Sequence, residues 1–216
     1  MTRRRPAALL LDLDGTLVDS EPIHRAAYEA FFTARGWEVT DLTLFTGRRA
    51  EDVFASEPGP WDGEDPDALK AAIAALVPVD ADPDPVRGAR AVIEAAAERD
   101  VPVAIVTSAG PDWAERCLDV VLGVRHHVGV VVTAHDVVGG KPDPAGFRHA
   151  ADLLGVPTAD CIAVEDSPAG VTAALAAGVV EVYGLSTTHA AERLTAAGAV
   201  AVHSDLRTLA GVFTGS

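Results

Sequence analysis

Residues 9–20 read Leu-Leu-Leu-Asp-Leu-Asp-Gly-Thr-Leu-Val-Asp-Ser, and this stretch decides the fold. The apolar run before Asp12 is typical of a strand that is buried on both faces in a parallel sheet. Because strand side chains alternate, Asp12 and Asp14 share one side, and Gly15 lets the backbone turn behind them. Two acids at the end of a buried strand cost folding free energy, so their presence indicates that something at this position requires negative charge. The alternative interpretation is a strand followed by a solvated Asp-Gly turn.

The composition limits the partners of the protein. A formal net charge of −15 over 216 residues argues against nucleic acid or an anionic membrane as the main partner. The hydrophobic fraction of 49% is typical of a folded globular protein. The same negative charge would repel a phosphorylated ligand, so a phosphate site would need local positive charge, which a metal ion would supply.

Signals for export or membrane insertion are weak in the sequence. The first apolar run is interrupted by Asp12 too early for a signal peptide, and no later window is long and apolar enough to cross a bilayer. Cys117 and Cys161 show neither a disulfide framework nor metal-ligand spacing, and both lie in apolar patterns typical of a core. We expect a cytoplasmic protein that is a monomer or a weak dimer.

Helices and strands alternate along the chain after residue 85. This alternation predicts an α/β fold, a Rossmann-like parallel sheet covered by helices on both faces. The predicted elements are helices over 86–98, 112–122, 144–154, 168–177, 189–197 and 206–212, and strands over 101–106, 129–133, 161–165, 180–184 and 200–203. The first strand belongs to the same sheet, so residues 1–19 and 85–216 are predicted to form one core domain.

Residues 20–84 are predicted to form a helical insertion in this core domain. Ser20 is a candidate N-cap of a helix that runs to Arg35. Shorter helices are predicted over 41–45, 48–55 and 67–77. An acidic loop around Trp61 and a cluster of Asp and Pro at 80–85 separate these segments, and the second is typical of a hinge.

Polar side chains follow three of the predicted strands. They are Asp12 and Asp14 after the first strand, Thr107 and Ser108 after the second, and Glu165 with Asp166 at the end of strand 161–165. Ligands of open parallel sheets bind outside the carboxyl ends of the strands, so these side chains are expected at one edge. Each could be an ordinary strand terminus, but their coincidence favours a site.

Lys141 is a further candidate, because the chain otherwise uses arginine. Among 17 basic residues only Lys70 and Lys141 are lysine, and Lys141 lies in Gly-Gly-Lys-Pro-Asp-Pro. A compact ammonium suits a phosphoryl oxygen or nearby carboxylates, although a solvated loop lysine is the alternative. The adjacent acids Glu165 and Asp166 would repel each other without a cation, and oxygen-only ligands favour Mg²⁺. We therefore expect Mg²⁺ as a cofactor.

These motifs resemble those of the haloacid dehalogenase-like hydrolases. Asp12, Asp14 and Thr16 fill the family pattern Asp-x-Asp-x-Thr/Val, and residues 140–144 match Gly-Lys-Pro-x-Pro. The chain is similar to the branch that contains phosphoglycolate phosphatase, glycerol-3-phosphatase, sugar phosphatases and β-phosphoglucomutase. The resemblance implies that residues 20–84 are a small helical cap that closes over the site and selects the substrate.

The resemblance also implies roles for the residues of the core domain. Asp12 would attack phosphorus, and Asp14 would protonate the leaving oxygen and then activate water. Asp166 would bind Mg²⁺ directly with Glu165 in or near the first shell, and Asp12 and the backbone carbonyl of Asp14 would complete the metal site. The phosphate-binding residues would be Thr107, Ser108 and Lys141. Because Asp14 is present, phosphoryl transfer is favoured over dehalogenation.

Three residues of the insertion are candidates for substrate specificity. Arg48 and Arg49 follow Gly47 where relatives carry an arginine for the remote part of the substrate, although the register is off by one residue from the mutase pattern. His24 aligns with a hinge histidine of the mutases. The alternatives are an exposed, salt-bridged helix start and a surface histidine.

Together these features predict a Mg²⁺-dependent phosphatase of a small phosphorylated metabolite, a sugar or polyol phosphate, that works through an aspartyl-phosphate. One alternative is a β-phosphoglucomutase, which returns the phosphoryl group to the sugar. The other is a catalytically silent binding module, against which the intact Asp12, Asp14, Lys141 and Asp166 argue.

Overall fold

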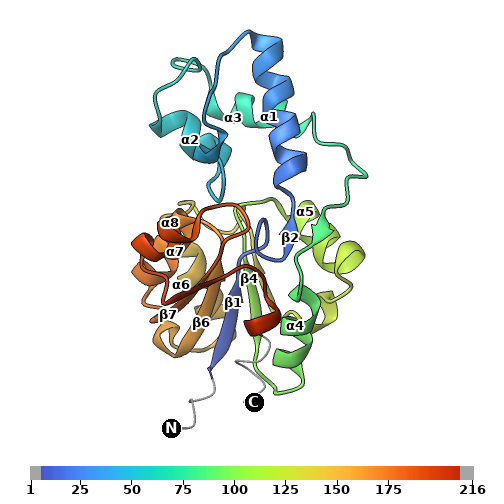
Figure 1. The fold of residues 1–216 in the computed structure, drawn as a ribbon, viewed down its shortest axis with the longest axis vertical. Helices are drawn as coiled ribbons and strands as arrows, with labels where there is room; N and C mark the ends of the chain where they lie inside the picture. The colour runs from blue at the N-terminus through green and yellow to red at the C-terminus, as the bar shows by residue number, and fades with distance from the viewer. Residues whose placement is uncertain (1–5, 210–216) are drawn as a thin grey trace.

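The core domain is built on a six-stranded parallel sheet (Figure 1). The computed structural model describes residues 6–209. The strands are, in spatial order, β5 (Val130–Val132), β4 (Val103–Val106), β1 (Ala8–Leu11), β6 (Cys161–Glu165), β7 (Glu181–Leu185) and β8 (Ala201–His203). Strand β1 is central, with Leu10 opposite Ala104 of β4 and Ala163 of β6. This explains why its sequence is continuously apolar.

Alternate side chains of β1 enter two apolar cores on opposite faces of the sheet. Leu9 and Leu11 pack in one core with Ile93, and Leu10 packs in the other with Phe147. The helices are α4 (Ala89–Ala97) and α5 (Pro111–Arg116) on the first face, and α6 (Ala145–Leu154), α7 (Pro168–Ala177) and α8 (Ala191–Ala197) on the second. The prediction of a parallel sheet covered on both faces is confirmed.

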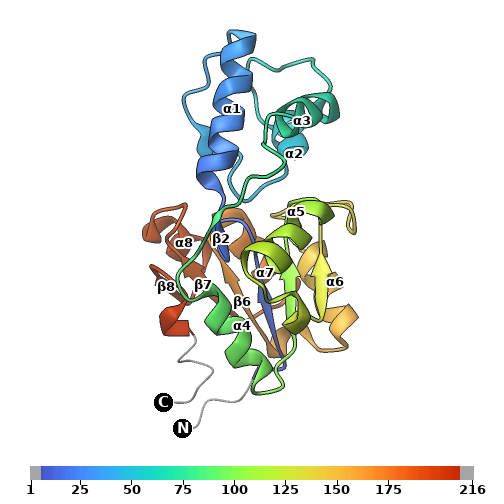
Figure 2. The same ribbon diagram turned by 90° about the vertical axis from the view of Figure 1, so that its right-hand side faces the viewer.

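The cap lies over the carboxyl edge of this sheet (Figures 1 and 2). Its helices are α1 (Glu21–Arg35), α2 (Ala50–Ser56) and α3 (Pro66–Ala74), with a 3₁₀ turn at Leu42–Leu44. They enclose a separate apolar core that contains Phe32, Phe54 and Trp61. The loop around Trp61 is therefore a structural part of the cap. The predicted cap insertion is confirmed.

Two short strands connect the cap to the core domain. Strand β2 (Val18–Asp19) precedes α1, and the antiparallel β3 (Asp84–Pro85) follows the cap, so both connections lie side by side (Figure 2). Two-residue strands are too short to give a periodic signal, and the sequence predicted only a hinge at β3. We retain residues 20–84 as the proposed extent of the cap.

Three local features differ from the sequence-based expectations. The helix predicted over 112–122 is α-helical only to Arg116 and continues as a π-helical turn, Cys117–Val121. Ser20 precedes α1 as expected, but its hydroxyl does not cap the helix. The helix predicted over 206–212 is observed at residues 207–209; Leu206 lies in a bend before it, and residues 210–212 lie outside the described residues.

Both cysteines, Cys117 and Cys161, are free and buried, in line with the sequence analysis. Within residues 6–209, no helix combines the length and the apolar character that a membrane crossing requires.

Candidate active site

Two strand ends bring three acidic side chains together beneath the cap. Asp12 directly follows β1, Glu165 ends β6, and Asp166 follows it, and all three side chains are buried. One carboxylate oxygen from each lies within 4.8 Å of the others. This convergence follows from the parallel sheet, in which β1 and β6 are neighbours with their carboxyl ends at one edge.

Lys141 lies between two of these acids. Its ammonium donates to Oδ1 of Asp12 and lies 2.5 Å from Oε1 of Glu165, and its side chain is only 5% exposed. Burial alone would lower the pKa of Lys141, but the two carboxylates outweigh it and the pKa is raised. Lys141 is therefore a fixed positive charge. We call the set of Asp12, Glu165, Asp166 and Lys141 the carboxylate cluster.

The carboxylate cluster would carry more negative than positive charge with all three acids ionised, and this disfavours their ionisation. Burial raises the pKa of Asp12 to about 7, although the Lys141 ammonium acts in the opposite direction. Burial, and then the carboxylates of Asp12 and Glu165, raise the pKa of Asp166 well above its usual range. One ammonium for three buried carboxylates leaves the cluster short of positive charge.

Hydrogen bonds nevertheless hold two of the acids in place. Oε2 of Glu165 accepts from the backbone N–H groups of Asp166 and Ser167 and from the Ser167 hydroxyl. Asp166 accepts from the hydroxyls of Thr16 and Thr188. Orientation by donors that carry no charge fixes the carboxylates without neutralising them.

The carboxylate cluster fits a hard divalent cation such as Mg²⁺. Its donor atoms are all carboxylate oxygens, and Oδ2 of Asp12 is buried without a hydrogen-bond partner among the described residues. The backbone also approaches closely at Gly15, whose φ is 82°, because a Cβ there would lie 2.2 Å from Oδ2 of Asp166. Only glycine combines this backbone conformation with this contact.

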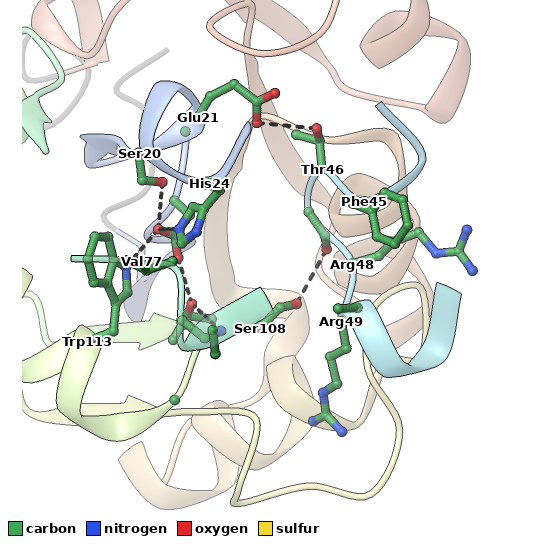
Figure 3. A pocket seen from close by; sticks show the side chains of 18 of the residues that line it. Ser20, Glu21, His24, Phe45, Thr46, Arg48, Arg49, Val77, Ser108 and Trp113 are labelled. Atoms are coloured by element: carbon green, nitrogen blue, oxygen red, sulfur yellow. Dashed lines mark hydrogen bonds and ion pairs between the residues drawn. The ribbon is translucent and has the colours of Figure 1, made fainter. Parts of the chain in front are cut away.

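Asp14 has a different environment from the cluster. Its side chain is 26% exposed. Oδ1 accepts hydrogen bonds from the Ser20 hydroxyl at 2.7 Å and from the Trp113 indole N–H at 2.8 Å (Figure 3). The Thr107 hydroxyl donates to Oδ2 at 3.4 Å, and Nε2 of His24 lies 3.5 Å from Oδ1. Asp14 thus faces the cavity, held by donors from both the core and α1.

These donors decide the charge of Asp14. Burial by itself would raise its pKa, but the interaction with His24 and the hydrogen bonds from Ser20 and Trp113 outweigh burial, so the pKa of Asp14 is lowered. Burial would lower the pKa of His24, but Asp14 outweighs it and the pKa of His24 is raised. Trp113 was not singled out by the sequence, where it is one aromatic residue after a Gly-Pro turn.

The two cap arginines have partners of their own. The Arg48 guanidinium pairs with Glu57 at 2.7 Å and Ser56 at 3.0 Å, both within the cap. The Arg49 guanidinium donates to the backbone carbonyls of Val137 and Val138 in the core, each at 2.9 Å. In Figure 3 both guanidinium groups point away from His24 and Trp113. Arg49 therefore joins the cap to the loop that leads to Lys141.

Ser108 makes a second contact between the core and the cap. Its hydroxyl donates to the backbone carbonyl of Gly47 at 3.4 Å (Figure 3). The neighbouring Thr107 hydroxyl accepts from the backbone N–H of Ala109. The structure thus brings Thr107 to Asp14, while Ser108 faces the cap.

A cavity of about 660 Å³ lies between the cap and the core. Asp12 and Asp14 line its floor, and the cap helices α1, α2 and α3 contribute its upper wall. His24, Arg48, Arg49 and Ser108 also line it. A small molecule that enters beneath the cap would therefore meet the partly exposed carboxylate of Asp14 and lie next to Asp12, whose Oδ2 is buried.

Comparisons with known proteins place this arrangement in a family. The model of the haloacid dehalogenase-like hydrolases matches residues 6–178. The chain is 40% identical over 192 residues to validoxylamine A 7'-phosphate phosphatase of Streptomyces hygroscopicus subsp. limoneus, covering 87% of this chain and 89% of that protein. It is 31% identical to hexitol phosphatase A of Escherichia coli, covering 81% of each chain. A solved structure of CbbY from Rhodobacter sphaeroides with phosphate is 26% identical, with a TM-score of 0.72 over 94% of this chain and 96% of that one.

Proposed function

The chain belongs to the haloacid dehalogenase-like hydrolase family and is a phosphoric monoester hydrolase, and we propose that it hydrolyses a sugar or polyol monophosphate through an aspartyl-phosphate on Asp12. One observation carries the proposal. Asp12 is a buried carboxylate with one oxygen on Lys141 and the other without a partner among the described residues, and it lines the floor of the cavity. The names of the phosphatase relatives support the substrate class.

In the first step Oδ2 of Asp12 attacks phosphorus. A new P–O bond forms to Asp12 while the bond from phosphorus to the ester oxygen breaks. The electron pair of that bond stays on the ester oxygen, which takes a proton from the Asp14 carboxyl group and leaves as the alcohol. Asp14 takes up this proton when the anionic phosphate ester binds beside it, because a neighbouring negative charge raises the pKa that its donors lower in the free protein. Lys141 holds the other oxygen of Asp12 and thereby orients the attack.

In the second step water cleaves the aspartyl-phosphate. Asp14, now a carboxylate, takes a proton from water as the water oxygen attacks phosphorus, and the bond between phosphorus and Asp12 breaks. Inorganic phosphate leaves, and both acids return to their starting states. Asp14 is suited to both steps because it borders the cavity two residues after Asp12.

The cation has a supporting part in this proposal. Asp12 and Asp166 would hold Mg²⁺, with Glu165 and the backbone carbonyl of Asp14 beside it, and the bound ion would neutralise negative charge on the phosphoryl oxygens. Thr107 would donate a hydrogen bond to the same group by turning from Asp14, Ser108 would do so by turning from Gly47, and Lys141 would add its positive charge.

A screen of phosphate release tests the proposal. We expect release of inorganic phosphate from hexose and hexitol monophosphates in Mg²⁺ and from p-nitrophenyl phosphate as a minimal substrate. Asp12→Asn should reduce turnover to below about a thousandth, because an amide does not attack phosphorus, whereas Asp19→Asn, at an exposed position of β2, should not. Isomerisation of β-glucose 1-phosphate without phosphate release would favour the mutase alternative.

A further inference from the structure

The cavity is larger than a hexose monophosphate requires. A water molecule occupies about 30 Å³ in the liquid, so the roughly 16 non-hydrogen atoms of such an ester would fill at most about 480 Å³ at that spacing. Covalently bonded atoms pack more closely, so this value is an upper limit. The cavity measures about 660 Å³, even though Arg49 and Gly47 already join the cap to the core on one side. A second ring therefore has room beyond the first.

The positive side chains around this extra space already have partners. Among the described residues that line the cavity, every arginine and lysine has an acidic or carbonyl partner. The partners are Glu21 for Arg25 at 2.8 Å, Glu51 for Lys70 at 2.6 Å, Glu57 for Arg48 at 2.7 Å, Asp82 for Arg116 at 2.8 Å and two backbone carbonyls for Arg49 at 2.9 Å. A second phosphate group would have to break one of these pairs, but an uncharged group would not.

Aromatic and apolar side chains form other parts of the wall. Trp113 of the core and Phe45 of the cap lie on opposite sides of the cavity, and Val77 also lines it (Figure 3). Tyr28 adds a ring packed against Phe45, with a distance of 4.5 Å between ring centroids. Sugar rings present apolar C–H faces between their hydroxyls, and such faces pack on aromatic rings because both lose contact with water.

We propose that the preferred substrate is the monophosphate of an uncharged alcohol of two linked rings, the size of a disaccharide. The inference rests on the proposed function and adds two properties to it, the size of the alcohol and its lack of a second phosphate. Phosphorus lies over Asp12, the first ring passes Asp14, and the second ring occupies the space between Trp113 and Phe45.

A substrate panel tests the size and the charge separately. The probes are disaccharide monophosphates esterified at a primary hydroxyl (trehalose 6-phosphate, maltose 6'-phosphate and cellobiose 6-phosphate), glucose 6-phosphate, fructose 1,6-bisphosphate and p-nitrophenyl phosphate. We expect kcat/KM for the best disaccharide ester to be at least tenfold higher than for glucose 6-phosphate. The kcat/KM for fructose 1,6-bisphosphate should not exceed that for glucose 6-phosphate. Equal values for one and two rings, or preference for the bisphosphate, would overturn the inference.

The same panel separates this inference from the proposed function. If p-nitrophenyl phosphate and hexose phosphates are hydrolysed without a preference for two rings, only the inference fails. If no phosphate ester is hydrolysed by the folded protein in Mg²⁺, the proposed function fails with it.

Two variants locate the second ring. Ala74 at the end of α3 is exposed and lines the cavity, whereas Ala72 of the same helix is exposed and does not. Ala74→Trp should lower kcat/KM for the disaccharide ester at least fivefold and leave p-nitrophenyl phosphate unchanged, and Ala72→Trp should change neither. Equal losses for both substrates in Ala74→Trp would contradict this placement.

A variant that leaves Lys70 without its acidic partner tests whether the paired charges exclude a second phosphate group. Glu51→Gln removes the partner of Lys70 and leaves an unpaired ammonium at the cavity. We expect the ratio of kcat/KM for fructose 1,6-bisphosphate to that for glucose 6-phosphate to rise severalfold. An unchanged ratio would show that the pairing does not exclude a second phosphate.

Discussion

The only two lysines of the chain serve different ends of the site, and their surroundings differ: Lys141 contacts Asp12 at the floor of the cavity, and Lys70 lines the cavity from the cap. Lys141 is buried among three carboxylates, whereas Lys70 in the cap is 40% exposed and pairs with Glu51 alone. At the first end charge is concentrated and left unbalanced, which suits the transfer of a charged phosphoryl group. At the second end charge is balanced, which suits the binding of an uncharged alcohol. The difference assigns chemistry to the core and selection to the cap.

Removal of the metal from the carboxylate cluster should have the largest effect on activity. We expect exhaustive chelation to abolish phosphate release and Mg²⁺ to restore it, while Ca²⁺ should inhibit, because its larger and looser coordination misplaces Asp12. Mg²⁺ should also raise the Tm, because it relieves the repulsion among Asp12, Glu165 and Asp166. Full activity after chelation, or a Tm that does not respond to Mg²⁺, would contradict the metal site.

Replacing the two lysines compares the two ends directly. Lys141→Met should lower the free energy of unfolding by roughly 3–5 kcal/mol in chelator, because it leaves buried carboxylates without their ammonium. It should also lower kcat by more than about a hundredfold, since the charge on the phosphoryl group loses a partner. Lys70→Met removes a partly exposed ion pair and should lower the free energy of unfolding by less than about 1 kcal/mol.

Urea unfolding and steady-state kinetics of both variants check this pair of predictions. Equal losses of stability in Lys141→Met and Lys70→Met would mean that the two ends do not differ in the way that their burial indicates.

A variant of Trp113 tests whether its hydrogen bond positions Asp14. Trp113→Phe retains an aromatic ring but removes the N–H donor to Asp14, and we expect kcat to fall by about tenfold or less, as for the loss of one hydrogen bond of about 1 kcal/mol. Trp61→Phe is the matched control, because the Trp61 N–H donates to the carbonyl of Glu57 inside the cap. A larger loss of kcat in Trp61→Phe than in Trp113→Phe would remove Trp113 from the positioning of Asp14.

The cap arginines should have effects no larger than that of Trp113, and the smallest is expected for Arg48. Arg49→Ala removes two hydrogen bonds between the cap and the core, so kcat/KM should fall by about tenfold for a hexitol phosphate and for p-nitrophenyl phosphate alike. Arg48→Ala removes a partly exposed ion pair within the cap and should lower the free energy of unfolding by less than about 1 kcal/mol. A loss confined to the larger substrate in Arg49→Ala would instead indicate contact between this arginine and the substrate.

The fold was predictable because its signals are local. Apolar runs such as Ala7–Leu11, with breakers between them, indicated the parallel sheet, and the acids after Leu11 and Val164 indicated its active edge. The contacts of Trp113 and Arg49 were not predictable, because they join segments that are about 90 to 100 residues apart in the chain. The role of Ser20 was also missed, because its hydroxyl donates to Asp14 instead of capping the helix. Tertiary structure decided these partners.

The central claim is that Asp12 carries the phosphoryl group during turnover. Acid quenching within the first turnover, followed by mass spectrometry of the peptide that contains Asp12, tests it directly. We predict a transient phosphate on Asp12 that is absent without substrate and absent in Asp12→Asn. A burst of phosphate release with no phosphorylated peptide, or with the phosphate on another residue, would contradict the account.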